Sequence, residues 1–296
     1  MGSVKIKKVT KMQNEIELKI MLEPHNIEAI KKWLATQPIL TQHTDELINT
    51  YYDTPSLFFA NQKMGLRVRK VNQHCEMTLK TKGEIVGGLH IRPEYNMNLP
   101  NDKPDFKRLD DHFNLQFSNV EDIHHSLEKV FSTDVTRTCW VIQYKNTEIE
   151  IALDQGWVKN KWGEDPICEI ELELKKGELS DLMQFLNDLP TLDGMYFSAF
   201  SKAERGYFVG RPEKIAKKVN DLTACDSSTM TKAEKYQFEQ NLADIIRILP
   251  TENTILLEQF ITLSNIDILN WQQLKDYLKS QGYLKQNIRL IQQLYL

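Results

Sequence analysis

The chain has 296 residues, of which 41% are hydrophobic and 26% are charged, a composition typical of a globular protein with one large domain or two. With 37 basic and 41 acidic residues the formal net charge is −4, so overall charge provides no attraction to nucleic acid or to an anionic membrane. An anion-binding site must therefore be built locally, from clustered Arg and Lys side chains.

The cysteine pattern indicates a reducing compartment, and the lack of long apolar runs argues against secretion and membrane insertion. The cysteines are far apart and form no C-x-x-C pair, which argues against a zinc site and a disulfide-stabilised scaffold. No segment is long and apolar enough for a secretory signal or a membrane span. We expect a cytoplasmic protein with a small-molecule substrate, no nucleic-acid or membrane partner, and an oligomeric state that the sequence leaves open. The cysteines are Cys75, Cys139, Cys168 and Cys225.

The first predicted element is a strand with one charged face. Over residues 14–20, Glu15, Glu17 and Lys19 alternate with aliphatic side chains, which is the period of a β-strand. Glu and Lys are poor strand formers. An exposed sheet face would explain one isolated strand of this kind, but the same pattern recurs along the chain.

Helical and turn signals separate this strand from the next block. Residues 24–36 have helical apolar spacing, with a proline suited to the first turn, and are predicted to cover the apolar face of a sheet. Residues 46–55 read as a strand closed by a turn, and residues 57–63 as a short helix. Residues 100–127 carry loop signals and short apolar clusters, which predict loops and short helices.

The charged alternation returns in segments 65–69, 76–82 and 89–94, and again in a second block of strands that begins near residue 131. Each segment places its charged side chains on one face. Residues 179–189 are predicted to form a helix, and residues 201–207 a short one that carries Lys202 and Arg205 on one side. The charged-face residues of the strands are Arg67, Arg69, Glu76, Lys80, Lys82, His90, Arg92, Glu94, Arg137, Glu148, Glu150, Asp154, Glu169, Glu171 and Glu173.

The C-terminal part has a different composition. We predict a domain over residues 1–211, a linker over 212–229 and a small helical region over 230–296. The last region has apolar stripes at helical spacing, including a capping box that begins at Thr231, but no cluster of reactive side chains. No histidine follows His125.

The recurring charged faces favour an α+β fold: a closed eight-stranded antiparallel β-barrel with helices packed outside, followed by a small C-terminal α-helical region. The charged faces would then line a tunnel. Charges removed from water without partners cost several kcal/mol each, but here the basic and acidic side chains nearly balance. A polyanion bound with hard metal ions also nearly balances, since phosphate suits Arg and Lys, and carboxylates suit Mg²⁺ or Mn²⁺.

At these residues the sequence resembles the CYTH family, the triphosphate tunnel metalloenzymes, and is most similar to its bacterial inorganic triphosphatase (tripolyphosphatase) branch. Glu15-x-Glu17-x-Lys19 matches the family's opening motif, and the later charged strands follow in the expected order up to the segment 201–207. Close relatives carry a longer, histidine-rich helical domain, the CHAD domain. The shorter region here lacks such histidines, so we do not expect a CHAD-like role.

The resemblance implies metal-dependent hydrolysis of tripolyphosphate to diphosphate and phosphate inside the tunnel, with Mg²⁺ or Mn²⁺ as cofactor. It implies catalytic roles for Glu15, Glu17, Lys80, Glu169 and Glu171, and Lys80 or Lys82 as donor of a proton to the leaving oxygen. Glu76 and Glu94 are expected as salt-bridge partners of the basic groups. The implied phosphate-binding residues are Lys19, Arg67, Arg69, Lys80, Lys82, Arg92, Arg137, Lys202 and Arg205. The implied metal and water ligands are Glu15, Glu17, Glu150, Asp154, Glu169, Glu171 and Glu173.

Two other readings remain open at this point. The same fold could serve a class IV-type adenylate cyclase or a thiamine triphosphatase, which need contacts to a base or a thiazolium. Alternatively, the tunnel could bind polyphosphate or nucleotide without catalysis, with the helical region as a docking element. Phosphate release from tripolyphosphate, ATP and thiamine triphosphate would separate these readings.

Overall fold

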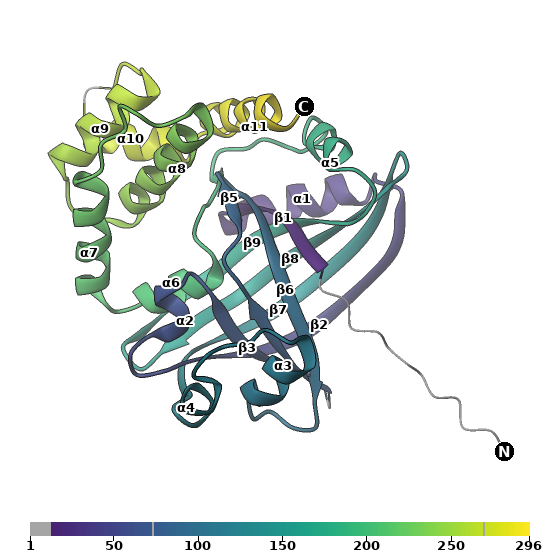
Figure 1. Ribbon diagram of the computed structural model, residues 1–296. Helices are drawn as coiled ribbons and strands as arrows, with labels where there is room; N and C mark the ends of the chain where they lie inside the picture. The colour runs from purple at the N-terminus through teal and green to yellow at the C-terminus, as the bar shows by residue number, and fades with distance from the viewer. Residues whose placement is uncertain (1–12, 73, 269) are drawn as a thin grey trace.

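A computed structural model describes residues 13–72, 74–268 and 270–296, and the predicted features of residues 1–12 lie outside this part. Eight antiparallel strands close into a barrel, which confirms the predicted fold (Figure 1). The strands are β1 (Gln13–Leu22), β2 (Ile39–Asp53), β3 (Gly65–Val71), β4 (His74–Lys80), β6 (Leu89–Leu99), β7 (Glu128–Tyr144), β8 (Thr147–Asn160) and β9 (Gly163–Lys176). Around the ring their order is β1-β9-β8-β7-β2-β3-β4-β6, and β6 pairs back with β1. Two short strands, β5 (Glu84–Val86) and β10 (Met195–Phe197), extend the sheet beside β6 and β1.

Several strands are longer than the sequence predicts. Strand β2 has 15 residues and pairs with β7 from Ile39 opposite Ile142 to Asp53 opposite Glu128. Its first half is largely exposed and carries Thr, Gln and His side chains. That half therefore has no apolar face that would reveal a strand in the sequence, and it is held by its hydrogen-bonded neighbour.

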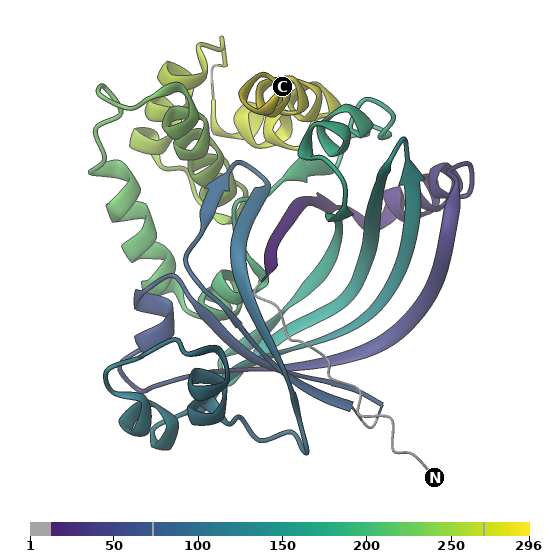
Figure 2. The same ribbon diagram turned by 45° about the vertical axis from the view of Figure 1, so that its right-hand side comes forward.

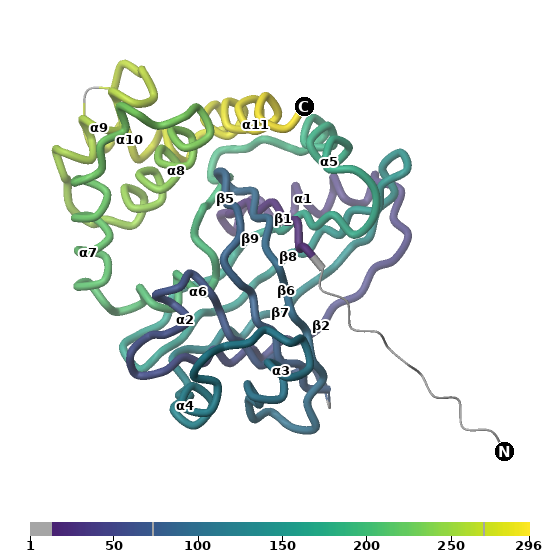
Figure 3. Tube along the Cα trace, in the orientation of Figure 1, coloured from purple at the N-terminus to yellow at the C-terminus, as the bar shows by residue number. Residues whose placement is uncertain are grey.

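The outer face of the barrel is covered by helices, as predicted. The segment expected at 24–36 forms a short 3-10 turn, Pro24–Asn26, and helix α1 (Ile27–Leu34). Helix α1 and helix α5 (Leu179–Phe185) pack on the aliphatic side chains of β1, β8 and β9, which form one core. A second group of helices covers β3, β4 and β6, with α3 and α4 at the bottom of Figures 1 and 3 and α2 at the left, beside α6. It consists of α2 (Phe58–Asn61), α3 (Phe106–Phe113) and α4 (Val120–His125).

The C-terminal helices form a separate core and also dock on the barrel (Figure 2). They are α6 (Lys202–Phe208), α7 (Pro212–Thr223), α8 (Lys232–Ile248), α9 (Thr254–Ser264), α10 (Trp271–Leu278) and α11 (Gln281–Tyr295). In α11, Leu284, Ile288 and Ile291 join the core formed by β1, α1 and α5. Among the described residues, no helix is long and apolar enough to cross a membrane.

Helix α7 occupies residues 212–223 of the segment expected as a linker at 212–229. Pro212 opens the helix in its first turn, and Ile215, Val219 and Leu222 pack on the core of the C-terminal helices. The helix is polar on most of its surface, and this explains why its composition resembles a linker. Only the residues after Thr223 connect it to α8 without helical structure.

Candidate functional site

The barrel encloses a cavity of about 760 Å³ whose wall carries the predicted charged face. The alternation along each strand sends the aliphatic residues outward; Leu18 and Ile20, for example, are fully buried in the outer core. The charged residues between them must then face the interior. The predicted site residues that line the cavity are Glu15, Glu17, Lys19, Arg67, Arg69, Lys80, Lys82, Arg92, Arg137, Glu150, Asp154, Glu171, Glu173 and Lys202.

Two predicted site residues, Glu169 and Arg205, do not line the cavity. Glu169 is fully buried and forms ion pairs with Lys19, Lys202 and Arg205. Arg205 also donates to the Pro166 carbonyl oxygen at 2.6 Å. The structure therefore places this pair behind the cavity wall, where it holds the side chains that do face the cavity.

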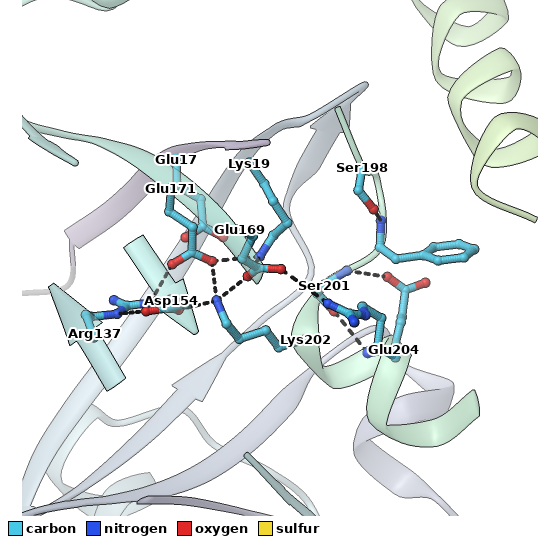
Figure 4. A network of polar contacts seen from close by, with 12 residues as sticks. Glu17, Lys19, Arg137, Asp154, Glu169, Glu171, Ser198, Ser201, Lys202 and Glu204 are labelled. Carbon is cyan, nitrogen blue, oxygen red and sulfur yellow. Dashed lines mark hydrogen bonds and ion pairs between the residues drawn. The ribbon is translucent and has the colours of Figure 1, made fainter. Parts of the chain in front are cut away.

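A dense group of ion pairs, the buried cluster, lies where β8, β9 and helix α6 meet (Figure 4). The Lys19 ammonium lies 2.6 Å from Glu171 and 2.9 Å from Glu169. The Lys202 ammonium lies 2.7 Å from both Asp154 and Glu171 and also contacts Glu169. Besides these residues, the buried cluster contains Arg137.

Arg137 completes the buried cluster with a two-pronged contact. Its Nε and Nη2 donate to the two carboxylate oxygens of Asp154 at 2.6 Å each, and Nη2 also contacts Glu171 at 2.6 Å. Burial by itself would raise the pKa of Asp154, but Arg137 and Lys202 outweigh it and lower that pKa to about 2. The pKa of Glu171 is likewise held well below its usual range, since the effect of Lys19, Lys202 and Arg137 exceeds that of burial.

Local sequence sets the position of Lys202. Ser201 caps helix α6: its side chain accepts from the Glu204 amide, and the Glu204 carboxylate accepts from the Ser201 amide (Figure 4). Lys202 is therefore the first residue of the helix, and Arg205 follows three residues later on the same side, as predicted.

A second acidic group, the carboxylate row, consists of Glu17, Glu173 and Glu150. They stand directly opposite one another on β1, β9 and β8. Like charges in that position repel. Burial, and to a smaller extent the carboxylates of Glu15 and Glu150, raise the pKa of Glu173 to about 7, although Lys175 at 2.9 Å opposes the shift. Within the described part of the chain, Glu150 has no ion-pair partner.

The remaining wall of the cavity is rich in guanidinium groups. Arg69 donates from Nε to the neutral amide oxygen of Asn49 at 2.8 Å. Burial and the nearby Arg67 and Arg137 lower the pKa of Arg69 to about 10. Among the described residues, Arg67 contacts one distant carboxylate, Glu94 at 3.9 Å, and the Thr78 hydroxyl at 3.2 Å. This wall therefore carries positive charge that the protein itself does not fully neutralise.

Two of the other basic residues on the cavity wall, Lys80 and Arg92, have acidic partners. Lys80 lies 2.5 Å from Glu15 and 3.7 Å from Glu94, and Arg92 lies 3.1 Å from Glu17. The expected role of Glu94 as a salt-bridge partner is thus confirmed. These pairs hold the side chains in place while leaving them on the cavity surface.

The carboxylates fit a hard divalent cation by their chemistry, because Mg²⁺ and Mn²⁺ prefer oxygen ligands. Oxygen atoms of Asp154, Glu169 and Glu171 lie within 4.8 Å of one another, but each already accepts from basic side chains. In the carboxylate row, Glu17 and Glu173 each have a single basic partner, Arg92 and Lys175, and Glu150 has none among the described residues. Burial first and neighbouring carboxylates second raise the pKa of Glu173, and a bound cation would oppose that shift. The row is therefore the better fit.

Several cavity-lining residues were missed by sequence reasoning. Asn49 and Tyr51 alternate on β2, and the period-two pattern alone could have found them. Gln237 and Asn241 come from helix α8. Two amides four residues apart on a helix carry no sequence signal that separates them from ordinary surface residues.

Comparison with known proteins agrees with this geometry. The sequence model of the CYTH domain matches residues 13–207. The inorganic triphosphatase of Haemophilus influenzae is 41% identical over 210 residues, which are 71% of this chain and 58% of that protein. The chain thus spans less than two thirds of the length of this curated relative.

Two solved structures align with lower similarity. A putative adenylyl cyclase from Hippeastrum has 17% identity and a TM-score of 0.43, covering 58% of this chain and 84% of that one. The PH1819 protein from Pyrococcus horikoshii has 21% identity and a TM-score of 0.41, covering 64% of this chain and 97% of that one. These scores are too low to carry an argument, whereas the domain match covers most of the sequence and includes every strand of the closed barrel. The chain belongs to the CYTH family.

Proposed function

We propose that this chain hydrolyses inorganic triphosphate to diphosphate and phosphate inside the barrel cavity. The observation that carries the proposal is the contrast between the two walls. On one wall, burial together with the neighbouring Arg67 and Arg137 lowers the pKa of Arg69; on the other, burial and to a smaller extent the carboxylates of Glu15 and Glu150 raise the pKa of Glu173. A polyanion accompanied by a divalent cation relieves both repulsions at once. The 41% identity to an inorganic triphosphatase supports the same substrate.

In this proposal the basic residues of the cavity hold the phosphate oxygens. The least neutralised of them, Arg67 and Arg69, bind the chain most strongly, and Lys202 extends the basic surface from helix α6. Water attacks a terminal phosphorus, the bridging P–O bond breaks, and the basic groups offset the charge that develops on the leaving oxygen. Lys80 or Lys82 donates a proton to the leaving oxygen. Lys80 is kept protonated by its acidic neighbours, which raise its pKa against the effect of burial. The other phosphate-binding residues are Lys19, Arg92 and Arg137, with Arg205 acting from behind the wall.

The carboxylate row would hold Mg²⁺ or Mn²⁺, together with Glu15. Such an ion, when bound, polarises phosphate oxygens and acidifies a coordinated water. Asp154, Glu169 and Glu171 would act mainly by fixing Lys19, Lys202 and Arg137. A small-molecule substrate and a cytoplasmic location complete the proposal.

A substrate panel tests the reaction. Phosphate release is measured with tripolyphosphate, ATP and thiamine triphosphate, each with Mg²⁺, with Mn²⁺ and with a chelator. We expect tripolyphosphate to give the highest kcat/KM, and the chelator to abolish turnover. Preference for ATP or thiamine triphosphate would favour the alternative enzymes of this fold, and binding without turnover would indicate a non-catalytic module.

Matched variants test the site. Glu171→Gln and Glu169→Gln should each abolish turnover, whereas Glu148→Gln, on β8 outside the cavity, should keep it. Charge reversal in Arg67→Glu should raise KM for tripolyphosphate by about 100-fold, since it replaces attraction by repulsion at a buried position. An unchanged KM would contradict phosphate contact at Arg67.

A further inference from the structure

The segment that delivers Lys202 to the cavity is held from outside the barrel. After strand β10, residues 198–201 form a connector that leads directly into helix α6. Ser198, Ala199 and Phe200 are buried, and Ala199 and Ser201 line the cavity beside Lys202. The connector has no helix or strand hydrogen bonds of its own at residues 198–200, so its amides need other acceptors.

Helix α8 supplies that acceptor through Asp244, which is 3% exposed. Its Oδ2 accepts from the Ala199 amide at 2.8 Å, from the Ser198 hydroxyl at 3.2 Å and from the Phe200 amide at 3.3 Å. A carboxylate that accepts several buried donors forms charge-assisted bonds, which are stronger than neutral ones. One side chain of the C-terminal helices therefore fixes the whole first part of the connector.

Arg247, one turn further along α8, fixes Asp244 in turn. Its Nη1 donates to Asp244 Oδ1 at 2.9 Å and to the Phe197 carbonyl oxygen at 3.4 Å. Its Nε and Nη2 donate to the carbonyl oxygen of Leu278 on α10. The two charges are thus paired and surrounded by hydrogen bonds, so Asp244 has no freedom to turn away from the connector.

We propose that Asp244 is a positioning residue for triphosphate binding, acting through the connector on Lys202. The proposal rests on the phosphate-binding role assigned above to Lys202. The helix cap Ser201 is the last residue of the connector, and Figure 4 shows Ser198, Ser201 and Lys202 along one continuous segment beside the buried cluster. A displacement at residues 198–200 shifts the start of α6, and with it the Lys202 ammonium that contacts Asp154 and Glu171. Helix α8 lies outside residues 13–207, the segment that the CYTH domain model matches, and in this way contributes a positioning residue to the site.

The main test variant is Asp244→Asn, which keeps the size of the side chain. Its amide has a single acceptor oxygen, so the NH₂ group faces either the connector amides or Arg247, and the side that it faces loses its acceptor. Ser198→Ala removes hydrogen bonds from the connector side and leaves α8 intact. The control is Gln240→Ala, one turn earlier on α8, which loses buried hydrogen bonds to Tyr283 and Asn287 but none to the connector.

Two measurements separate positioning from general stability. We expect Asp244→Asn to increase hydrogen exchange in residues 199–205 and to raise KM for tripolyphosphate about tenfold, with a smaller change in kcat. Ser198→Ala should also increase hydrogen exchange in residues 199–205 and raise KM, each by a smaller amount. Gln240→Ala should lower the melting temperature while leaving KM and exchange at 199–205 unchanged.

The proposal is overturned if Asp244→Asn and Ser198→Ala behave like Gln240→Ala, with lower stability and an unchanged KM. If Asp244→Asn does not fold, Ser198→Ala decides by the same criterion. A wild-type chain that does not hydrolyse tripolyphosphate would contradict the proposed function instead. The comparison of hydrogen exchange at residues 199–205 would then still show whether Asp244 fixes the connector.

Discussion

Strand β9 carries three glutamates on one face, and their pKa values shift in opposite directions along the strand. Glu169 and Glu171 lie among Lys19, Lys202 and Arg137, and their pKa values are lowered despite burial. Glu173, only two residues further on, belongs to the carboxylate row, and burial, with a smaller effect of neighbouring carboxylates, raises its pKa to about 7. The side chain and the strand are the same, so the difference comes from the neighbours that the barrel brings opposite.

The contrast separates carboxylates that hold basic side chains in place from carboxylates that are available to a metal cation. In the buried cluster every carboxylate has basic partners within 3 Å, so a metal cation there would compete with bonds already made. In the carboxylate row the protein keeps an unfavourable arrangement that a cation would improve. Proteins often accept such a local cost at functional sites. The comparison can be tested by removing charges from each group.

The largest effect is expected in the buried cluster. Lys19→Met leaves Glu169 and Glu171 short of a basic partner at a buried position, because Lys19 is 2% exposed. We expect the free energy of unfolding in urea to fall by about 3–5 kcal/mol, the usual cost of breaking a buried ion pair. The control, Lys107→Met, breaks the exposed pair with Glu121 and should change stability little. Equal effects of the two variants would refute the buried cluster as a structural unit.

The fold could be predicted where one strand face is buried against helices. The alternation of β1 and of 168–175 in β9 follows directly from that packing. Residues 39–45 of β2 were missed because both faces are exposed, and pairing with β7 alone makes them a strand. Helix α7 was missed because its apolar stripe is narrow and its composition is that of a loop.

Period-two spacing also predicted most of the strand residues that line the cavity, Glu169 being an exception, but not what each one does there. Whether Glu171 or Glu173 has basic partners depends on the position of helix α6 and on the register of β1 with β9. Neither is visible in local sequence. Asp244 was missed for a related reason, since a single carboxylate in a helix predicts a solvated charge until the connector is seen against it.

The next prediction uses the pH dependence of Glu173 in protein free of divalent cations. Its pKa is about 7 in the fold against 4.5 for an ordinary Glu. Between these values the folded chain holds a proton that the unfolded chain releases, so stability falls as the pH rises. We expect Glu173→Gln to flatten the slope of the free energy of unfolding between pH 4.5 and 7, by at most about 1 kcal/mol per pH unit.

Lys175→Met should shift the pH dependence of the free energy of unfolding in the direction opposite to Glu173→Gln. Lys175 is the basic group that opposes the shift of Glu173, so its removal should move the fall in stability to higher pH. The measurement is urea unfolding at a series of pH values with a chelator present. If Glu173→Gln and the wild type have parallel pH profiles, the carboxylate row is not under electrostatic stress.

The smallest expected effect has the opposite sign to the first. Glu150→Gln removes one charge from the carboxylate row without breaking any ion pair, so the metal-free protein should become more stable by about 0.5–1 kcal/mol. The same change should reduce the rise in melting temperature that Mg²⁺ or Mn²⁺ causes in the wild type, because it removes a ligand. Glu148→Gln, two residues earlier on β8 and paired with Lys176 at 3.6 Å, is the control and should show neither effect. A loss of stability in Glu150→Gln, with an unchanged response to the cations, would mean that the row is structural like the buried cluster and that the cation binds elsewhere.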